Sequence, residues 1–249
     1  MEQKFGMRRT HIASTLDTMT NVLYLLARQY LSNPSIFHDR MPYYANLVEH
    51  KCFGLLSNVW GFIDGRVRKT CRPFYFQKHC YSGHKRYHGL KYQSMYTPDG
   101  LFAHLYGPIY GNRHNSFMIQ ESGFLQAMEL LFNNQDKNSY AVYGDPAYPQ
   151  SPLILGGFRY AVSGSDKTIW NCMISHVRQA VEWGFGSITK NFPFLDFSKL
   201  MKIFKHPIAK YYIAGAFLTN IHICMYGNQT TAYINAETLS VEDYLSFCL

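Results

Sequence analysis

Apolar positions near the start of the chain follow a helical period. Steps of three or four residues separate Ile12, Leu16, Met19, Leu23 and Leu26, which predicts a helix over about residues 10–31. The dipeptide Asn33-Pro34 interrupts this pattern, and a second helical stretch follows at about residues 43–56. Both stretches precede the first predicted strand, so residues 1–56 are predicted to form an N-terminal helical arm.

The central part of the chain changes to short apolar runs typical of strands. Residues 58–64 (NVWGFID) and 140–145 (YAVYGD) are two such runs, and each ends in an aspartate. Residues 87–96 and 101–106 flank the turn sequence TPDG, which predicts a β-hairpin. The remaining predicted elements are helices at residues 117–132, 167–190 and 208–226 and a loop at residues 146–165. This order predicts one mixed α/β domain at residues 57–249.

Composition adds a preference for a polyanionic partner. Lys plus Arg total 24 and Asp plus Glu total 16, which gives a formal charge of +8. Such a charge attracts nucleic acid, although an ordinary soluble basic protein carries it equally well. The six cysteines form no C-x-x-C pair, the N-terminus is too polar for a secretory signal, and no apolar run approaches membrane-spanning length. We therefore expect reduced thiols inside the cell and no membrane partner.

Three acidic residues are candidates for one metal-binding site. Asp64 and Asp145 end predicted strands, where ligand sites are commonly built, although a turn aspartate beside glycine is the simpler interpretation of each. Glu182 lies on the polar stripe of the helix at residues 167–190, where an ion pair with Arg178 is the simpler interpretation. Converging carboxylates suit Mg²⁺ or Mn²⁺, and two such ions can act together on a phosphodiester.

Several motifs together resemble one known family. The passages that carry the resemblance are WGFIDG at residues 60–65, YSGHKR at 81–86, LKYQS at 90–94, GPIYGNRHNS at 107–116, GDPAYP at 144–149, and the set Asn171, Arg178, Val181, Glu182 and Gly186. In this order they resemble the PIF/Harbinger transposase superfamily and its nuclease-like relatives, over about residues 10–245. The resemblance implies a ribonuclease H-like mixed sheet flanked by helices.

The same resemblance implies a function and a set of site residues. The expected activity is divalent-metal-dependent cleavage of DNA, with strand joining, by a DDE-type endonuclease or transposase that acts in the nucleus. Asp64, Asp145 and Glu182 are the implied catalytic residues and ligands of Mg²⁺ or Mn²⁺, with two ions expected. Phosphate contacts are expected from Lys85, Arg86, Lys91, Arg113 and Arg178, each of which is otherwise an ordinary solvated basic residue.

Two departures from the family pattern support an alternative. Asn115 stands where the family usually has Asp, and only about 60 residues precede Asp64, which is short for the family's upstream helix-turn-helix region. The alternative is a domesticated, catalytically inactive protein that binds DNA or another protein. The resemblance further suggests a separate Myb-like DNA-binding partner, and paired transposon ends suggest a homodimer.

A structural zinc site is a further alternative for the middle of the chain. Cys71, His79, Cys80 and His84 are chemically suitable ligands and lie within fourteen residues. Their spacing differs from that of standard zinc fingers, and the adjacent His79 and Cys80 would need an unusual geometry to share one ion. The sequence therefore favours the acidic site over zinc.

Overall fold

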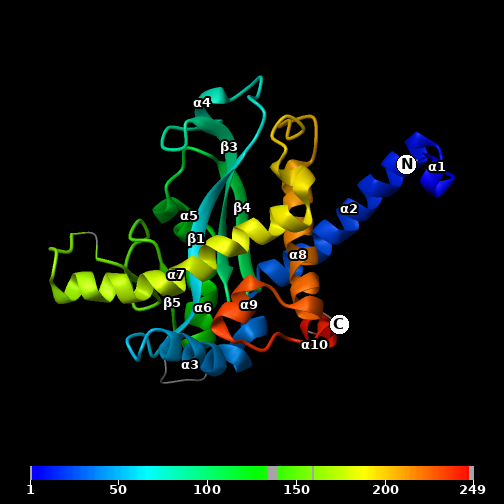
Figure 1. Cartoon of the computed structure of the whole chain (residues 1–249). Helices are drawn as coiled ribbons and strands as arrows, with labels where there is room; N and C mark the ends of the chain where they lie inside the picture. Colours follow the sequence, from blue (N-terminus) through cyan, green and yellow to red (C-terminus); the bar gives the residue numbers. More distant parts are fainter. Residues whose placement is uncertain (1, 134–139, 159, 247–249) are drawn as a thin grey trace.

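A mixed β-sheet forms the centre of the molecule (Figure 1), and the computed structural model describes residues 2–133, 140–158 and 160–246. The strands are β1 (Val59–Lys69), β2 (Tyr81–Ser82), β3 (Tyr87–Tyr96), β4 (Phe102–Tyr110), β5 (Ala141–Gly144) and β6 (Ile154–Gly156). The order across the main sheet is β4-β3-β1-β5-β6, and β2 pairs with the start of β3. Strands β1, β3 and β4 are antiparallel neighbours, whereas β5 and β6 run parallel to β1. This topology is consistent with the ribonuclease H-like α/β fold, so the predicted fold class is confirmed.

Helices flank this sheet (Figure 1). The helices of the described residues are α1 (Glu2–Phe5), α2 (Arg9–Leu31), η1 (Pro34–Arg40), α3 (Met41–Lys51), α4 (Gln77–Cys80), α5 (Asn115–Glu121), α6 (Phe124–Asn133), α7 (Asp166–Asn191), η2 (Pro193–Asp196), α8 (Ile208–Tyr226), α9 (Gln229–Ile234) and α10 (Val241–Ser246). Within the described ranges, none of these helices combines the length and apolar character that crossing a bilayer requires.

The structure corrects several predicted element boundaries. The helix predicted at residues 117–132 is divided into α5 and α6, because Gly123 between them has a φ of +70°, which a continuous helix does not accommodate. Strand β1 continues past Asp64 to Lys69, and β6 lies within the segment predicted to be a loop. Both differences arise from pairing between strands: the extension of β1 pairs with β3, and β6 pairs with β5.

Helix α7 crosses the sheet from β5 to β3. Near its start, the Trp170 ring lies 6.3 Å from that of Tyr143 on β5. Further along, the Phe185 ring meets that of Tyr96 on β3 edge-on at 5.4 Å. Figure 1 shows the helix lying across the strands. The turn between these two contacts therefore passes over β1, the strand between β5 and β3.

A buried amide of α8, the side chain of Asn220, forms hydrogen bonds with the edge strand β4. The Asn220 side chain accepts a hydrogen bond from the Phe102 backbone N–H at 2.8 Å and donates one to the Phe102 carbonyl at 2.9 Å. It also donates to the Tyr244 hydroxyl at 2.9 Å, so α8 holds β4 and α10 together. A buried amide with several partners avoids the cost of desolvation that an unpaired polar group incurs.

The N-terminal helices contribute to this core only in part. At the end of α2, Tyr30 is buried and its ring lies 5.2 Å from that of Phe217 on α8. Earlier in α2, Leu16 and Leu25 are 57% and 64% exposed, and this end of the helix projects from the body (Figure 1). In α3, the Tyr44 hydroxyl donates to the buried Asp99 carboxylate at 2.7 Å. The division into an arm and a catalytic domain at residues 56 and 57 stays a prediction.

Candidate active site

An open cleft of about 900 Å³ lies where β1 leaves its pairing with β5. Its lining combines the two predicted aspartates with several basic and amide side chains. These lining residues include Asp64, Arg66, Lys85, Lys91, Arg113, Asn115 and Asp145. Clefts of this size with converging polar groups are the usual location of active sites.

Asp64 and Asp145 lie next to each other because of the strand register. Ile63 of β1 pairs with Gly144 of β5 in parallel, and each aspartate is the next residue in its own chain segment. The Asp64 carboxylate accepts a hydrogen bond from the Gly65 backbone N–H at 2.8 Å. The Asp145 carboxylate accepts one from the Ala147 N–H, also at 2.8 Å. Local backbone donors therefore orient both carboxylates at the cleft.

Strand alternation relates Asp64 to the face that α7 covers. Asp64 is two residues from Phe62, so both side chains belong to the same face of β1. Phe62 pairs with Tyr96, which packs against α7 at Phe185. The α7 backbone around residue 182 thus runs over the strand that carries Asp64. The side chains of Glu182 and Arg178 lie outside the described part of the chain, so their roles stay predictions.

Two buried side chains, Lys91 and Tyr148, interact electrostatically with both aspartates. Burial lowers the pKa of the Lys91 ammonium, and the carboxylates of Asp64 and Asp145 oppose this effect. The Lys91 amine donates to the Arg113 carbonyl at 2.8 Å. Burial, followed by the charges of Asp64 and Asp145, raises the pKa of the Tyr148 hydroxyl well above 10.0. A lysine and a protonated tyrosine therefore adjoin the acidic pair.

Gly65 allows Asn115 to approach β1. A side chain at Gly65 would place its Cβ 2.6 Å from the Asn115 Oδ1 atom and 3.2 Å from the Tyr148 hydroxyl. Glycine is therefore the residue that leaves room for the Asn115 amide beside the strand that carries Asp64. The departure from the family pattern at residue 115 thus lies within the cleft.

The basic residues predicted to contact DNA fall into different positions. Lys85 and Arg113 line the cleft and are exposed. Arg86 is exposed on the turn between β2 and β3 but is not among the cleft-lining residues. Lys91 lines the cleft but is only 8% exposed, and its amine is bound to backbone. The proposed contacts of these residues with DNA therefore stay predictions.

Sequence reasoning did not single out Arg66 or Tyr148. Arg66 is two residues beyond Asp64 in β1, so its place in the cleft could have been predicted from strand alternation if β1 had been extended past Asp64. Tyr148 is 3% exposed, and its hydroxyl has no hydrogen-bond partner among the described residues. Tyr148 belongs to the GDPAYP passage at residues 144–149, but nothing in that passage predicts the burial of its hydroxyl.

The structure does not support the zinc alternative. Cys71, His79, Cys80 and His84 all belong to the described residues, within which no three His, Cys, Asp or Glu side chains gather in a manner suited to a metal ion. His79 instead packs against the ring of Tyr110 at 5.3 Å, and Cys80 is buried.

The sequence of the chain matches the model of a known protein family. A family model described as DDE superfamily endonuclease matches residues 48–220, which is more than half of the chain. The chain belongs to this family. The matched segment extends from α3 into α8 and contains the whole sheet and the cleft. Neither a curated protein nor a solved structure matches the chain. The predicted DDE-type endonuclease family is thus confirmed, whereas the PIF/Harbinger type stays a prediction.

Proposed function

We propose that this chain is a Harbinger-type nuclease or transposase that cleaves DNA with the help of a divalent metal and joins the cleaved strand to a second site. The observation that carries the proposal is the pair Asp64 and Asp145, held side by side by parallel strand register at a cleft with basic walls. The local negative charge suits a cation, while the surrounding positive charge suits the phosphate backbone.

The residues at the cleft fit Mg²⁺ or Mn²⁺. These hard cations take oxygen ligands and are commonly held by one or two carboxylates together with waters and substrate phosphates. Asp64 and Asp145 would supply the carboxylates, and we propose Glu182 of α7 as the third acid. With two ions bound, the site would supply Lewis-acid polarisation of the phosphodiester and a nucleophile at neutral pH.

The remaining cleft residues would bind and orient the DNA. Lys85, Arg113 and Arg66 are the cleft cations that we assign to phosphate oxygens, because each lines the cleft and is exposed. We propose Arg86 and Arg178 as further contacts to phosphate. Lys91 is better suited to holding the two carboxylates and the Arg113 backbone in place, since it is largely buried.

Tyr148 would present a protonated hydroxyl near the acidic pair, without a hydrogen bond to either carboxylate. The raised pKa keeps its hydroxyl protonated throughout the neutral range, beside two carboxylates. Its location under Gly65 prevents large movement, because the ring is buried. We assign it to shaping the wall of the cleft beneath Gly65 rather than to the transfer of a proton.

A DNA substrate implies that the chain acts in the nucleus. A Myb-like protein would supply recognition of the DNA ends, and a homodimer would hold two ends together. The alternative function is a catalytically inactive protein that binds DNA or another protein. Asn115 favours this alternative, because an amide lies in the cleft where the family usually has a carboxylate.

The test of the proposal is nicking of supercoiled plasmid by the purified chain. We expect Mg²⁺ or Mn²⁺ to support nicking and EDTA to abolish it, because the carboxylates alone offer no Lewis acid. Restoring the metal should restore the nicking. Binding of the plasmid with no nicking in either metal, by a folded chain, would reject the nuclease and favour the inactive DNA-binding protein.

A further inference from the structure

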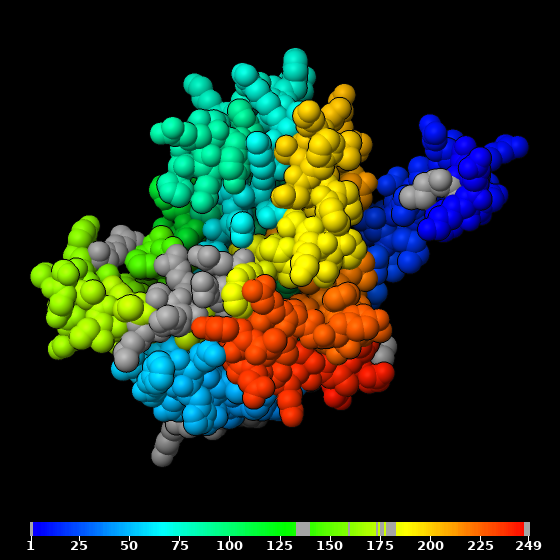
Figure 2. All heavy atoms as spheres, in the orientation of Figure 1, coloured from blue at the N-terminus to red at the C-terminus, as the bar shows by residue number. Residues whose placement is uncertain are grey.

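Four exposed aromatic rings gather at one end of the molecule. Phe74, Tyr75, Phe76 and Phe204, which we call the aromatic tip, are 84%, 63%, 55% and 65% exposed. The first three precede α4, and Phe204 lies between η2 and α8. A hydrogen bond from the Cys71 N–H to the Met201 carbonyl at 2.9 Å joins the two segments. Figure 2 shows these two parts of the chain side by side at the top of the molecule.

The rings of the tip contact one another rather than the core. The Phe74 and Tyr75 rings meet edge-on at 4.9 Å, and the Phe204 ring lies 6.4 Å from Tyr75 and 6.1 Å from Phe76. Phe76 and Phe204 have positive φ values of 57° and 70°, a conformation that bulky residues rarely adopt. Exposed aromatic surface of this extent is characteristic of an interaction site.

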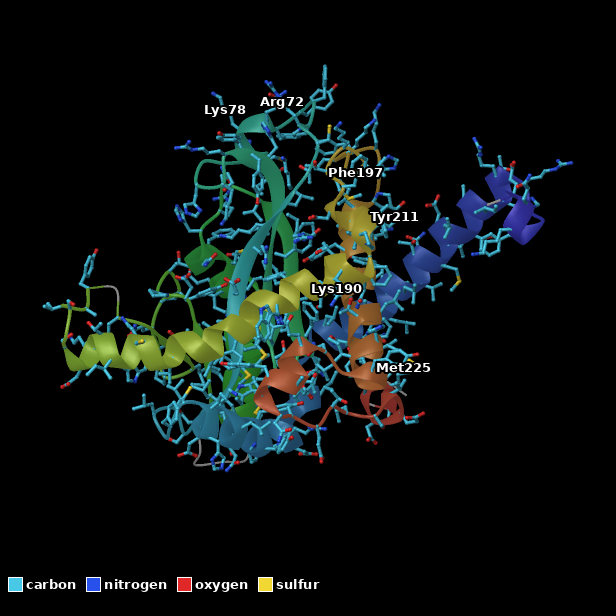
Figure 3. All side chains as sticks on the ribbon, viewed as in Figure 1. Arg72, Lys78, Lys190, Phe197, Tyr211 and Met225 are labelled. Carbon is cyan, nitrogen blue, oxygen red and sulfur yellow. The ribbon has the colours of Figure 1, made fainter. Side chains whose placement is uncertain are left out.

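Positive charge surrounds the tip. Residues 65–98 and 197–236 contain no Asp or Glu, although both segments contribute to this end of the molecule. Arg72, Lys78, Lys202 and Lys205 are exposed beside the rings, and Figure 3 shows Arg72 and Lys78 at the end of the molecule. Asp196 is the acid that precedes the second segment, and it pairs with Arg68 at 3.3 Å. Flat apolar rings within a cationic surface are complementary to unpaired bases on a phosphate backbone.

The tip is continuous with the cleft. The Asn112 N–H donates to the His79 carbonyl at 3.3 Å, and Asn112 lines the cleft. His79 also packs against Phe76, with ring centroids 6.1 Å apart. A strand that leaves the cleft along β2 and the residues around Asn112 would therefore reach the tip without crossing an acidic surface.

We propose that the aromatic tip binds single-stranded DNA by stacking its rings on unpaired bases, next to the cleft. In the cell this use rests on the proposed function, since cleavage or distortion of DNA would supply the unpaired strand. The binding itself requires no metal and no cleavage. It can therefore be measured separately from the nuclease activity.

The experiment compares two labelled oligonucleotides by fluorescence anisotropy in EDTA. One is an oligothymidylate of about 15 nucleotides, and the other has the same length and backbone but abasic sugars throughout. We expect the wild type to bind the oligothymidylate about tenfold or more tightly than the abasic strand. The double variant Phe74→Ala/Tyr75→Ala, and separately Phe204→Ala, should lower oligothymidylate affinity towards the abasic value without changing abasic affinity.

Two further variants complete the design. Tyr226→Ala removes a 71% exposed ring at the opposite end of α8 and should change neither affinity. Lys78→Ala/Lys205→Ala should weaken both oligonucleotides equally, because the backbone charge is common to them. Thermal unfolding midpoints of all the variants should match that of the wild type, since the altered side chains are exposed.

Other outcomes overturn the proposal. If the wild type binds both oligonucleotides equally, the tip holds no bases, and the rings serve a protein or lipid surface instead. Equal losses for both strands in the aromatic variants would mean that the rings only shape the backbone contact. Metal-dependent nicking with no base-dependent binding would reject this proposal alone, whereas base-dependent binding without nicking would reject only the nuclease.

Discussion

Replacing Asp145 with Asn is expected to lower the metal-dependent nicking rate by about 10³-fold, and Asp64→Asn is expected to do the same. A loss of this size corresponds to about 4 kcal/mol of transition-state stabilisation. Each substitution keeps the shape of the side chain but removes the negative charge of one of the two carboxylates, Asp64 or Asp145, that would bind the cation. Rates of supercoiled plasmid nicking in Mn²⁺ would measure the loss.

The matched control for these variants is Asp166→Asn. Asp166 is an exposed residue in the first turn of α7 and does not line the cleft, so the same chemical change should leave the nicking rate unaltered. Neither cleft variant should unfold, because the substitutions relieve repulsion between adjacent carboxylates. If nicking persisted at the wild-type rate in both cleft variants, the site would be wrongly assigned or the activity would come from a contaminant.

Gly184→Ala is expected to destabilise the folded chain by about 1–3 kcal/mol through overpacking. A Cβ at this position would lie only 2.2 Å to 2.7 Å from three atoms of the Tyr96 ring. Tyr96 is 2% exposed and is enclosed by Phe102 and Phe185, so the ring cannot easily move away. Helix α7 would have to rise from the sheet, which would also displace its turn around residue 182.

Gly186→Ala provides a control on the same helix, because a Cβ there meets no atom within 4 Å. This variant should be neutral or gain up to about 1 kcal/mol from the higher helix propensity of alanine. In thermal unfolding, the Gly184→Ala midpoint should fall by about 2–4 °C per kcal/mol. Adding Tyr96→Ala should make the further cost of Gly184→Ala disappear. A Gly184→Ala midpoint equal to that of Gly186→Ala would contradict the close approach of α7 to β3.

The elements that could be predicted from sequence are those with a strong local pattern. The helix at residues 208–226 agrees with α8, because a long apolar run is bounded by Pro207 and Gly227. The strand at residues 87–96 agrees with β3, because the TPDG turn follows it directly. Strand β6 has only three residues, and its identity comes from parallel pairing with β5. The extension of β1 past Asp64 likewise depends on its pairing with β3, which no local pattern records.

The site could be predicted in part for a related reason. Strands that end in an aspartate can be recognised in the sequence, whereas the register that places Ile63 beside Gly144 is set by the whole sheet. The burial of Lys91 and Tyr148 depends on packing around the cleft, so neither role could be assigned from residue type. Conversely, Arg86 belongs to the same basic motif as Lys85, but the turn between β2 and β3 directs only Lys85 to the cleft.

The central claim is that Asp64 and Asp145 together hold a divalent metal. The most direct test is Mn²⁺ binding, measured by the loss of the electron paramagnetic resonance signal of the free ion. The wild type and Asp166→Asn should bind Mn²⁺ equally, and Asp145→Asn should bind it much more weakly, since the site loses one of the two carboxylates that the strand register brings together. Equal binding by the wild type and Asp145→Asn, or none by the folded wild type, would contradict the claim.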